Sequence, residues 1–167
     1  MKIYLAGSMS GMTWEQQNSW RVSVKNELLK RMDLGGYNLD LTIVNPCEFF
    51  NYLKPENKFY SEKEAMDFDL HQVRNTDIIL VNFNNPKSIG TAMELMLAKE
   101  LNIPVVGIFE FNNTNDCFEE KIKESIHPWL IECCIRILPN QAAAIDYIET
   151  FYFKSFAKEN LVITIDK

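Results

Sequence analysis

The sequence has few of the features typical of nucleic-acid-binding or membrane-spanning proteins. Its 167 residues carry 17 basic and 23 acidic side chains, which gives a net charge of −6, and no basic stripe stands out. A polyanionic nucleic acid or an anionic membrane surface is therefore disfavoured as a partner. No apolar run approaches the length needed to span a bilayer, and the N-terminal residues show no signal-peptide pattern.

Metal-binding and disulfide patterns are also missing. The four cysteines, Cys47, Cys117, Cys133 and Cys134, show neither CxxC spacing nor histidines at zinc-finger distances. Cys133 and Cys134 lie in an apolar stretch, where we expect them to act as small hydrophobic residues. We therefore expect a reduced, cytoplasmic protein that needs neither a metal nor a cofactor.

The sequence does contain a regular alternation of apolar strand-like runs and segments with helical periodicity. Strands are expected at residues 2–6, 41–44, 77–83, 103–109 and 135–138, and helices at 14–31, 62–75, 89–98, 116–126 and 141–156. This alternation predicts an α/β domain with a doubly wound parallel sheet of about five strands in a three-layer sandwich. We expect one domain over residues 1–167, with a tail at 161–165 that could add an edge strand or pair with a second subunit.

The chain is organised around residues 87–98, which follow a buried strand and form a helix opened by Ser88. Glu94 is the only charged residue between positions 89 and 98. Stepping about 100° per residue places Glu94 on a face of small and apolar residues that includes Thr91 and Leu101. A carboxylate near the carboxyl end of a parallel strand points to the crevice where such sheets bind ligands. The alternative is a glutamate that reaches solvent or pairs with a cation.

A second acidic candidate lies on the helix expected at residues 62–75. Met66, Leu70 and Val73 form its apolar stripe, and Asp69 borders that stripe. Asp69 could therefore face the same crevice, whereas we expect the nearby Asp67 and His71 to be solvated.

Two loops are candidates for ligand contact. Residues 7–11, Gly-Ser-Met-Ser-Gly, leave the first strand and suit close approach of the backbone to an oxygen-rich ligand, although they match neither GxGxxG nor a Walker loop. We expect residues 47–61 to form a long loop, in which Phe49, Phe50 and Tyr52 could stack on a base or fill the core.

Three blocks in order along the chain carry a resemblance to a known family. Residues 2–8 (KIYLAGS), Asp69-Leu70 with residues 75–79 (NTDII), and residues 90–95 (GTAMEL) resemble the nucleoside 2-deoxyribosyltransferase family, which includes nucleoside 5′-monophosphate N-glycosidases. The resemblance covers roughly the first two-thirds of the chain. It implies a flavodoxin-like sheet and chemistry at the N-glycosidic bond of a small-molecule nucleoside or nucleotide.

The resemblance also implies roles for individual residues. Glu94 would attack the anomeric carbon of the sugar, Asp69 would orient the ligand and assist proton transfer at the base, and Tyr4 would hold Glu94 through its hydroxyl. The implied substrate-binding residues are Gly7, Ser8, Met9, Ser88 and Gly90. Active sites of this family are often completed by a neighbouring subunit, so a homodimer or higher homo-oligomer is expected.

These roles agree with the chemistry of N-glycosidic bonds. The reaction passes through an oxocarbenium-like state that a carboxylate stabilises or captures covalently, and the departing base needs a proton donor. If a second base captures the glycosyl-enzyme the reaction is transfer, and if water does so it is hydrolysis.

Some alternatives remain open. Family members that hydrolyse monophosphates carry an arginine in the first loop where this chain has Ser10, which favours a nucleoside unless Arg21 or Lys87 compensates. A phosphoribohydrolase of the lysine-decarboxylase-like type also uses Gly-Thr-x-x-Glu, but its paired glycines before that motif are absent here. A non-catalytic nucleotide-binding module is the third possibility.

Overall fold

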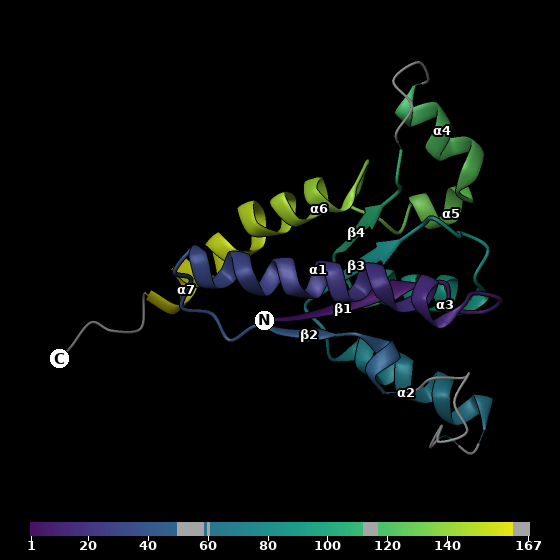
Figure 1. Cartoon of the computed structure of the whole chain (residues 1–167), viewed down its shortest axis with the longest axis horizontal. Helices are drawn as coiled ribbons and strands as arrows, with labels where there is room; N and C mark the ends of the chain where they lie inside the picture. Colours follow the sequence, from purple (N-terminus) through teal and green to yellow (C-terminus); the bar gives the residue numbers. More distant parts are fainter. Residues whose placement is uncertain (50–58, 60, 112–116, 162–167) are drawn as a thin grey trace.

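The computed structural model describes residues 1–49, 59, 61–111 and 117–161, and within these ranges five strands form one parallel sheet (Figure 1). The strands are β1 (Lys2–Gly7), β2 (Thr42–Val44), β3 (Ile78–Asn82), β4 (Val105–Ile108) and β5 (Arg136–Leu138). Their order in the sheet is β2-β1-β3-β4-β5, and every neighbouring pair is parallel. The predicted doubly wound α/β sheet is therefore confirmed, and its strand order is that of flavodoxin-like folds.

The strand order reverses at β1, which pairs with β2 on one side and with β3 on the other. The loops that leave β1 and β3 therefore diverge to opposite faces of the sheet and open a crevice at its carboxyl edge. Gly7 of β1 lies opposite Asn82 of β3 at this edge. The fold thus places the residues after Gly7 and after Asn82 beside each other.

The helices cover both faces of the sheet (Figure 1). They are α1 (Trp14–Leu34), η1 (Pro46–Glu48), α2 (Glu62–Arg74), α3 (Ile89–Glu100), α4 (Phe118–Ser125), α5 (Pro128–Ile131), α6 (Gln141–Ile148), η2 (Glu149–Phe153) and α7 (Lys154–Leu161). Side chains of α1, α6 and η2 form one apolar core with the sheet, and side chains of α2, α3, α4 and α5 contribute to the other. The two cores on opposite sides of the strands make the predicted three-layer arrangement.

Two helical boundaries differ from the predictions. The single helix expected at 141–156 is divided, because a π-helical segment, η2, separates α6 from α7. The short helix α5 was not predicted, since its four residues are too few to show a helical period. The possible strand at 161–165 lies outside the described residues except for Leu161, which ends α7.

The apolar stripes of two helices also differ from expectation. On α2, Ala65 and Val73 are the buried residues, whereas Met66 is exposed. On α1, the helix expected at 14–31, the buried residues are Gln17 and Arg21 together with the apolar Val24 and Leu28. Met66 and Gln17 line the cavity at the carboxyl edge of the sheet, whereas Arg21 is buried against backbone carbonyls of β1 and α1.

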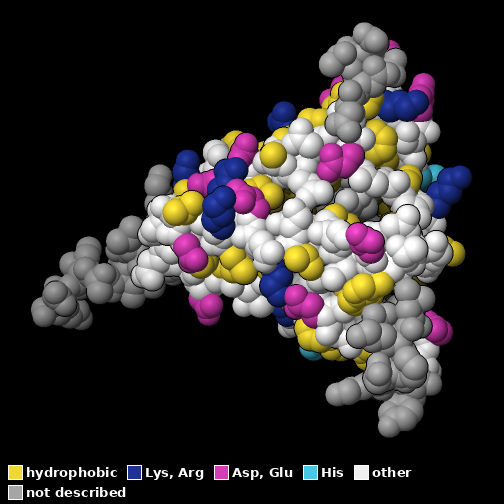
Figure 2. Space-filling view, in the orientation of Figure 1, with side chains coloured by type: hydrophobic (Ala, Val, Ile, Leu, Met, Phe, Trp, Pro, Cys, Tyr) yellow, Lys and Arg dark blue, Asp and Glu magenta, His cyan; other side chains and the backbone are white. Residues whose placement is uncertain are grey.

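The surface has mixed charge on the face shown in Figure 2, where basic and acidic side chains are interspersed. Among the described residues, no helix is both long enough and apolar enough to cross a membrane. Asp67 and His71 are exposed as predicted, and Asp67 forms an ion pair with Lys63.

Candidate active site

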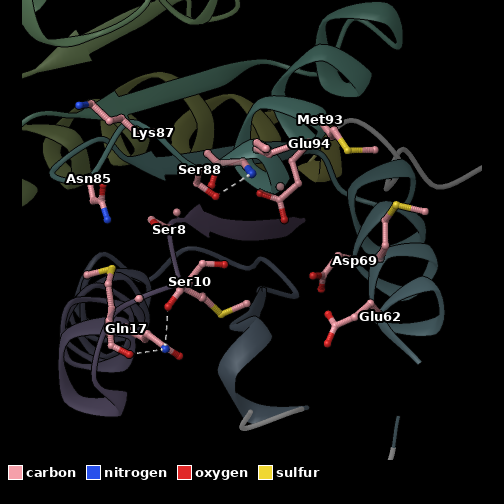
Figure 3. A pocket seen from close by; sticks show the side chains of 18 of the residues that line it. Ser8, Ser10, Gln17, Glu62, Asp69, Asn85, Lys87, Ser88, Met93 and Glu94 are labelled. Atoms are coloured by element: carbon pink, nitrogen blue, oxygen red, sulfur yellow. Dashed lines mark hydrogen bonds between the residues drawn. The ribbon is translucent and has the colours of Figure 1, made fainter. Parts of the chain in front are cut away.

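A cavity of about 850 Å³, here called the catalytic cavity, lies at the carboxyl ends of β1 and β3. The loop after β1, the helix α2 and the start of α3 line it (Figure 3). Of the residues predicted from the sequence, it brings together Gly7, Ser8, Met9, Asp69, Ser88, Gly90 and Glu94. The remaining one, Tyr4, is fully buried on β1 and reaches the cavity through Glu94.

Glu94 is 8% exposed and faces this cavity from α3. The Tyr4 hydroxyl donates a hydrogen bond of 2.7 Å to Glu94 Oε1. This bond joins a strand residue to a helix residue 90 positions away and limits the rotamers open to the carboxyl group. The hydrogen bond expected between these two side chains is therefore present in the structure.

The local sequence of α3 explains how Glu94 reaches the cavity. Ser88 is the N-cap, and its hydroxyl accepts a hydrogen bond from the Thr91 backbone N–H. Leu95 and Ala98 are fully buried and anchor the helix against the sheet, which turns Glu94 toward the crevice. The expected neighbour Leu101 is instead 44% exposed, because it follows the last turn of the helix and lies beyond the sheet-facing stripe.

Asp69 enters the cavity from α2, and Figure 3 shows its carboxyl group beside that of Glu62. Its Oδ1 atom is buried and has no hydrogen-bond partner among the described residues. The same holds for Thr91 Oγ1, which also lines the cavity. Buried polar atoms are rarely left without partners, so both atoms are available to a polar ligand.

Burial controls the protonation of the two carboxyl groups. It raises the pKa of Glu94 to about 8, with a further increase from the negative charge of Asp69, while the Tyr4 hydroxyl and Arg21 lower it. Burial likewise raises the pKa of Asp69 to about 7 against the lowering effect of Tyr4 and Arg21. The pair can therefore exchange protons with a substrate near neutral pH.

Arg21, one of the two cations that could replace the missing arginine of the first loop, does not face the catalytic cavity. It is fully buried, and its guanidinium donates to the carbonyl oxygens of Leu5, Gly7 and Gln17. It therefore supports the end of β1 from the α1 side of the sheet. Because it does not line the catalytic cavity, it cannot serve there as a direct phosphate ligand. Its spacing of three and seven residues before Val24 and Leu28 was the available signal that it shares their buried face.

Gly7 is required by the close packing at this point. Its φ is 157°, and a Cβ atom there would lie 3.1 Å from Trp20 Cζ2 and 3.4 Å from the Arg21 guanidinium. A side chain at this position would displace the indole or the buried cation, and with them the loop that borders the cavity.

The other candidates for ligand contact, Lys87, Ser10 and Phe49, differ in whether they line the catalytic cavity. Lys87 and Ser10 both line the catalytic cavity, so Lys87 is the described cation that could compensate for the missing arginine. Phe49 is 47% exposed and packs against Phe68, apart from the cavity lining, and Phe50 and Tyr52 lie outside the described residues.

Among the cysteines, Cys133 is buried and Cys134 half-buried, as expected for small hydrophobic residues, and burial raises the pKa of Cys134 to about 12. Within the described ranges, no cluster of three or more histidine, cysteine or acidic side chains could hold a metal ion.

The fold and the cavity define a flavodoxin-like α/β domain in which the buried Glu94 and the half-buried Asp69 line one cavity at the topological switch point. The chain belongs to the family described as a domain of unknown function, DUF4406, whose model matches residues 1–107. No curated protein matches this chain.

Solved structures share this fold. A conserved protein from Enterococcus faecalis V583 has a TM-score of 0.65 at 16% identity, over 89% of this chain and 97% of that one. A CMP N-glycosidase, BcmB, from Clostridium botulinum has 0.50 at 12% identity, over 90% and 99%. A 2-deoxyribosyltransferase from Bacillus psychrosaccharolyticus has 0.50 at 25% identity, over 88% and 92%. These similarities support the fold family suggested by the three sequence blocks.

Proposed function

We propose that this protein cleaves the N-glycosidic bond of a nucleoside or nucleotide, with Glu94 as nucleophile and Asp69 as proton donor. The observation that carries this proposal is the Glu94 carboxyl group, held by the Tyr4 hydroxyl at 2.7 Å in a cavity that Asp69 also lines. The similar structures of a 2-deoxyribosyltransferase and a CMP N-glycosidase support the same class of substrate.

The two carboxyl groups suit the two halves of the reaction. A Glu94 oxygen bonds to the anomeric carbon as the carbon–nitrogen bond breaks, and the electron pair stays on the base nitrogen, which takes the Asp69 proton. In the second half, a new base or a water molecule attacks the anomeric carbon, releases the Glu94 carboxylate and gives its proton to Asp69. Attack by a new base gives 2-deoxyribosyl transfer, and attack by water gives hydrolysis.

The protonation of the pair fits this sequence at neutral pH. With one pKa raised to about 7 and the other to about 8, the pair holds one proton between these pH values. Because Glu94 has the higher pKa, this proton lies mainly on Glu94, and the reactive form is the less populated one that carries the proton on Asp69 and leaves Glu94 ionised. Positive charge developing on the sugar favours this form, because a nearby ionised Glu94 stabilises it.

A substrate panel tests the activity. The protein is incubated with deoxynucleosides, ribonucleosides and their monophosphates, with and without a free acceptor base, and the products are separated by chromatography. Exchanged nucleoside identifies a transferase, and free base formed without an acceptor identifies a hydrolase. Recovery of every ligand intact would contradict the proposal and favour a non-catalytic binding module.

The role of Asp69 is tested by a substrate whose base needs no proton. We expect Asp69→Asn to lower kcat on an ordinary substrate by about 10²- to 10⁴-fold, the usual contribution of a positioned acid. On a 7-methylguanine nucleoside, whose cationic base leaves as a neutral molecule, the loss should be below about tenfold. Asp67→Asn, on the exposed side of the same helix, is the matched control and should keep full activity. Equal losses on both substrates would show that Asp69 does not donate the proton.

A further inference from the structure

A second cavity, of about 780 Å³, adjoins the catalytic cavity across the loop that follows β1. The two cavities share Ser8, Met12 and Asn85 as lining residues. The walls of the second cavity come from α1, from the residues that follow β3 and β4, and from the start of α6. It therefore lies on the opposite side of the switch point from Glu94, and the proposed reaction does not use it.

Two largely buried polar residues line this cavity and keep a hydrogen-bonding group free. Asn82 and Ser8 are each 7% exposed. The Asn82 side-chain oxygen accepts from the Asn84 backbone N–H at 2.8 Å, but its amide nitrogen donates to no residue in the described part of the chain. The Ser8 hydroxyl is likewise unpaired among the described residues. Neither atom is among the fully buried polar atoms without a partner, so both are open to the cavity and can hydrogen-bond to the oxygen atoms of a ligand.

The charged residues that line this cavity are all acidic. Glu15 on α1 and Glu110 after β4 contribute carboxylates from separate elements, and within the described ranges neither forms an ion pair. Glu15 also offsets the helix dipole in the first turn of α1, but Glu110 has no such structural role. No lysine or arginine lines this cavity among the described residues, so the site favours a cation and disfavours an anion.

We propose that the second cavity binds a small molecule with hydroxyl groups and a primary ammonium group, an amino sugar or amino alcohol. A ligand hydroxyl oxygen accepts from the Asn82 amide and pairs with the Ser8 hydroxyl. The ammonium group lies between the carboxylates of Glu15 and Glu110. This binding site extends beyond the proposed glycosidic chemistry and does not depend on it.

Titrations with three related sugars test this site. Glucosamine, glucose and glucuronate have similar size but positive, zero and negative charge, and each is added to ¹⁵N-labelled protein while spectra are recorded. We expect saturable binding of glucosamine with a shift of the Asn82 side-chain amide signal, weaker binding of glucose and none of glucuronate. Glu110→Gln should weaken glucosamine binding by about tenfold, the effect of one charge-assisted hydrogen bond. Glu100→Gln, on the exposed end of α3, should leave the Kd unchanged.

A separate variant locates the bound sugar. If glucosamine occupied the catalytic cavity instead, Asp69→Asn would weaken its binding and Glu110→Gln would not. That result would overturn the proposal, as would equal affinity for the three sugars or an unmoved Asn82 signal at saturation. The expected result is the reverse dependence, with Glu110 required and Asp69 dispensable.

Discussion

The two faces of the sheet use the same strands for different purposes. On β1, Ile3 and Leu5 point into the core under α1 and α6, which is apolar except at its carboxyl edge, where Arg21 of α1 is buried against backbone carbonyls of β1. The residue between them, Tyr4, points to the other face and presents its hydroxyl to Glu94. One face therefore contributes stability through apolar burial, whereas the other holds ionisable groups whose burial opposes folding when they are charged.

Substitutions on the two faces should therefore separate activity from stability. Removing an apolar side chain from the α1 face should destabilise the protein and leave its chemistry intact. Removing the buried acid from the α3 face should abolish the chemistry and leave the fold intact or more stable.

The largest effect is expected for Glu94→Ala. Loss of the nucleophile should reduce turnover by at least about 10⁴-fold, as for other enzymes deprived of a covalent nucleophile. Circular dichroism and thermal unfolding should remain those of a folded protein, because the variant removes a buried acid whose ionised form opposes folding. Full activity in a folded Glu94→Ala variant would refute the proposed role.

The opposite face is tested by Leu80→Ala. Leu80 is fully buried between the sheet and its α1 and α6 layer, so its truncation should lower the free energy of unfolding by about 3 kcal/mol. For a chain of this size, that corresponds to a fall in Tm of roughly 6–12 °C. The kcat per folded molecule should be unchanged at a temperature well below the new Tm. A proportionate loss of kcat would show that the two faces are not independent.

A smaller effect, with the opposite sign, is expected for the stability of Glu94→Gln at high pH. Burial raises the pKa of Glu94 from 4.5 to about 8, so the stability associated with its neutral form is complete below pH 4.5 and is lost as the pH rises to about 8. Glutamine stays neutral and keeps an oxygen that can accept from Tyr4. At pH 9 the variant should be more stable than the parent, and at pH 4 the two should unfold at nearly the same temperature. Thermal unfolding from pH 4 to 9 measures this difference, and parallel curves for both proteins would contradict it.

The sequence predicts the position of Glu94 and its helix better than it predicts the residues that support the cavity from the other face of the sheet. The strands, the N-cap Ser88 and the inward direction of Glu94 follow from local periodicity and capping, and the structure shows each of them. The buried position of Arg21 is indicated only by its helical spacing from Val24 and Leu28, a weak signal because arginines are rarely fully buried and its backbone-carbonyl partners leave no side-chain pattern.

The second cavity also could not be predicted from the sequence. Its walls come from four segments that are distant along the chain, and only their assembly in the fold creates it. The exposure of Met66 has a similar cause, since the periodicity that marks an apolar stripe does not show whether the stripe faces core or cavity.

The smallest effect is expected for Tyr4→Phe, which removes the hydroxyl group that donates to Glu94. Tyr4 is fully buried and lowers the pKa of Glu94 by its hydrogen bond, so the phenylalanine variant should raise that pKa further. The acidic limb of the pH–kcat profile should move up by about one pH unit, which lowers kcat at pH 7 by roughly tenfold. At high pH, where Glu94 is ionised in both proteins, the loss should be smaller. A loss of kcat that is the same at every pH would mean that Tyr4 positions Glu94 without changing its pKa. A shifted pH–kcat profile would show that Tyr4 sets the pH at which Glu94 can react.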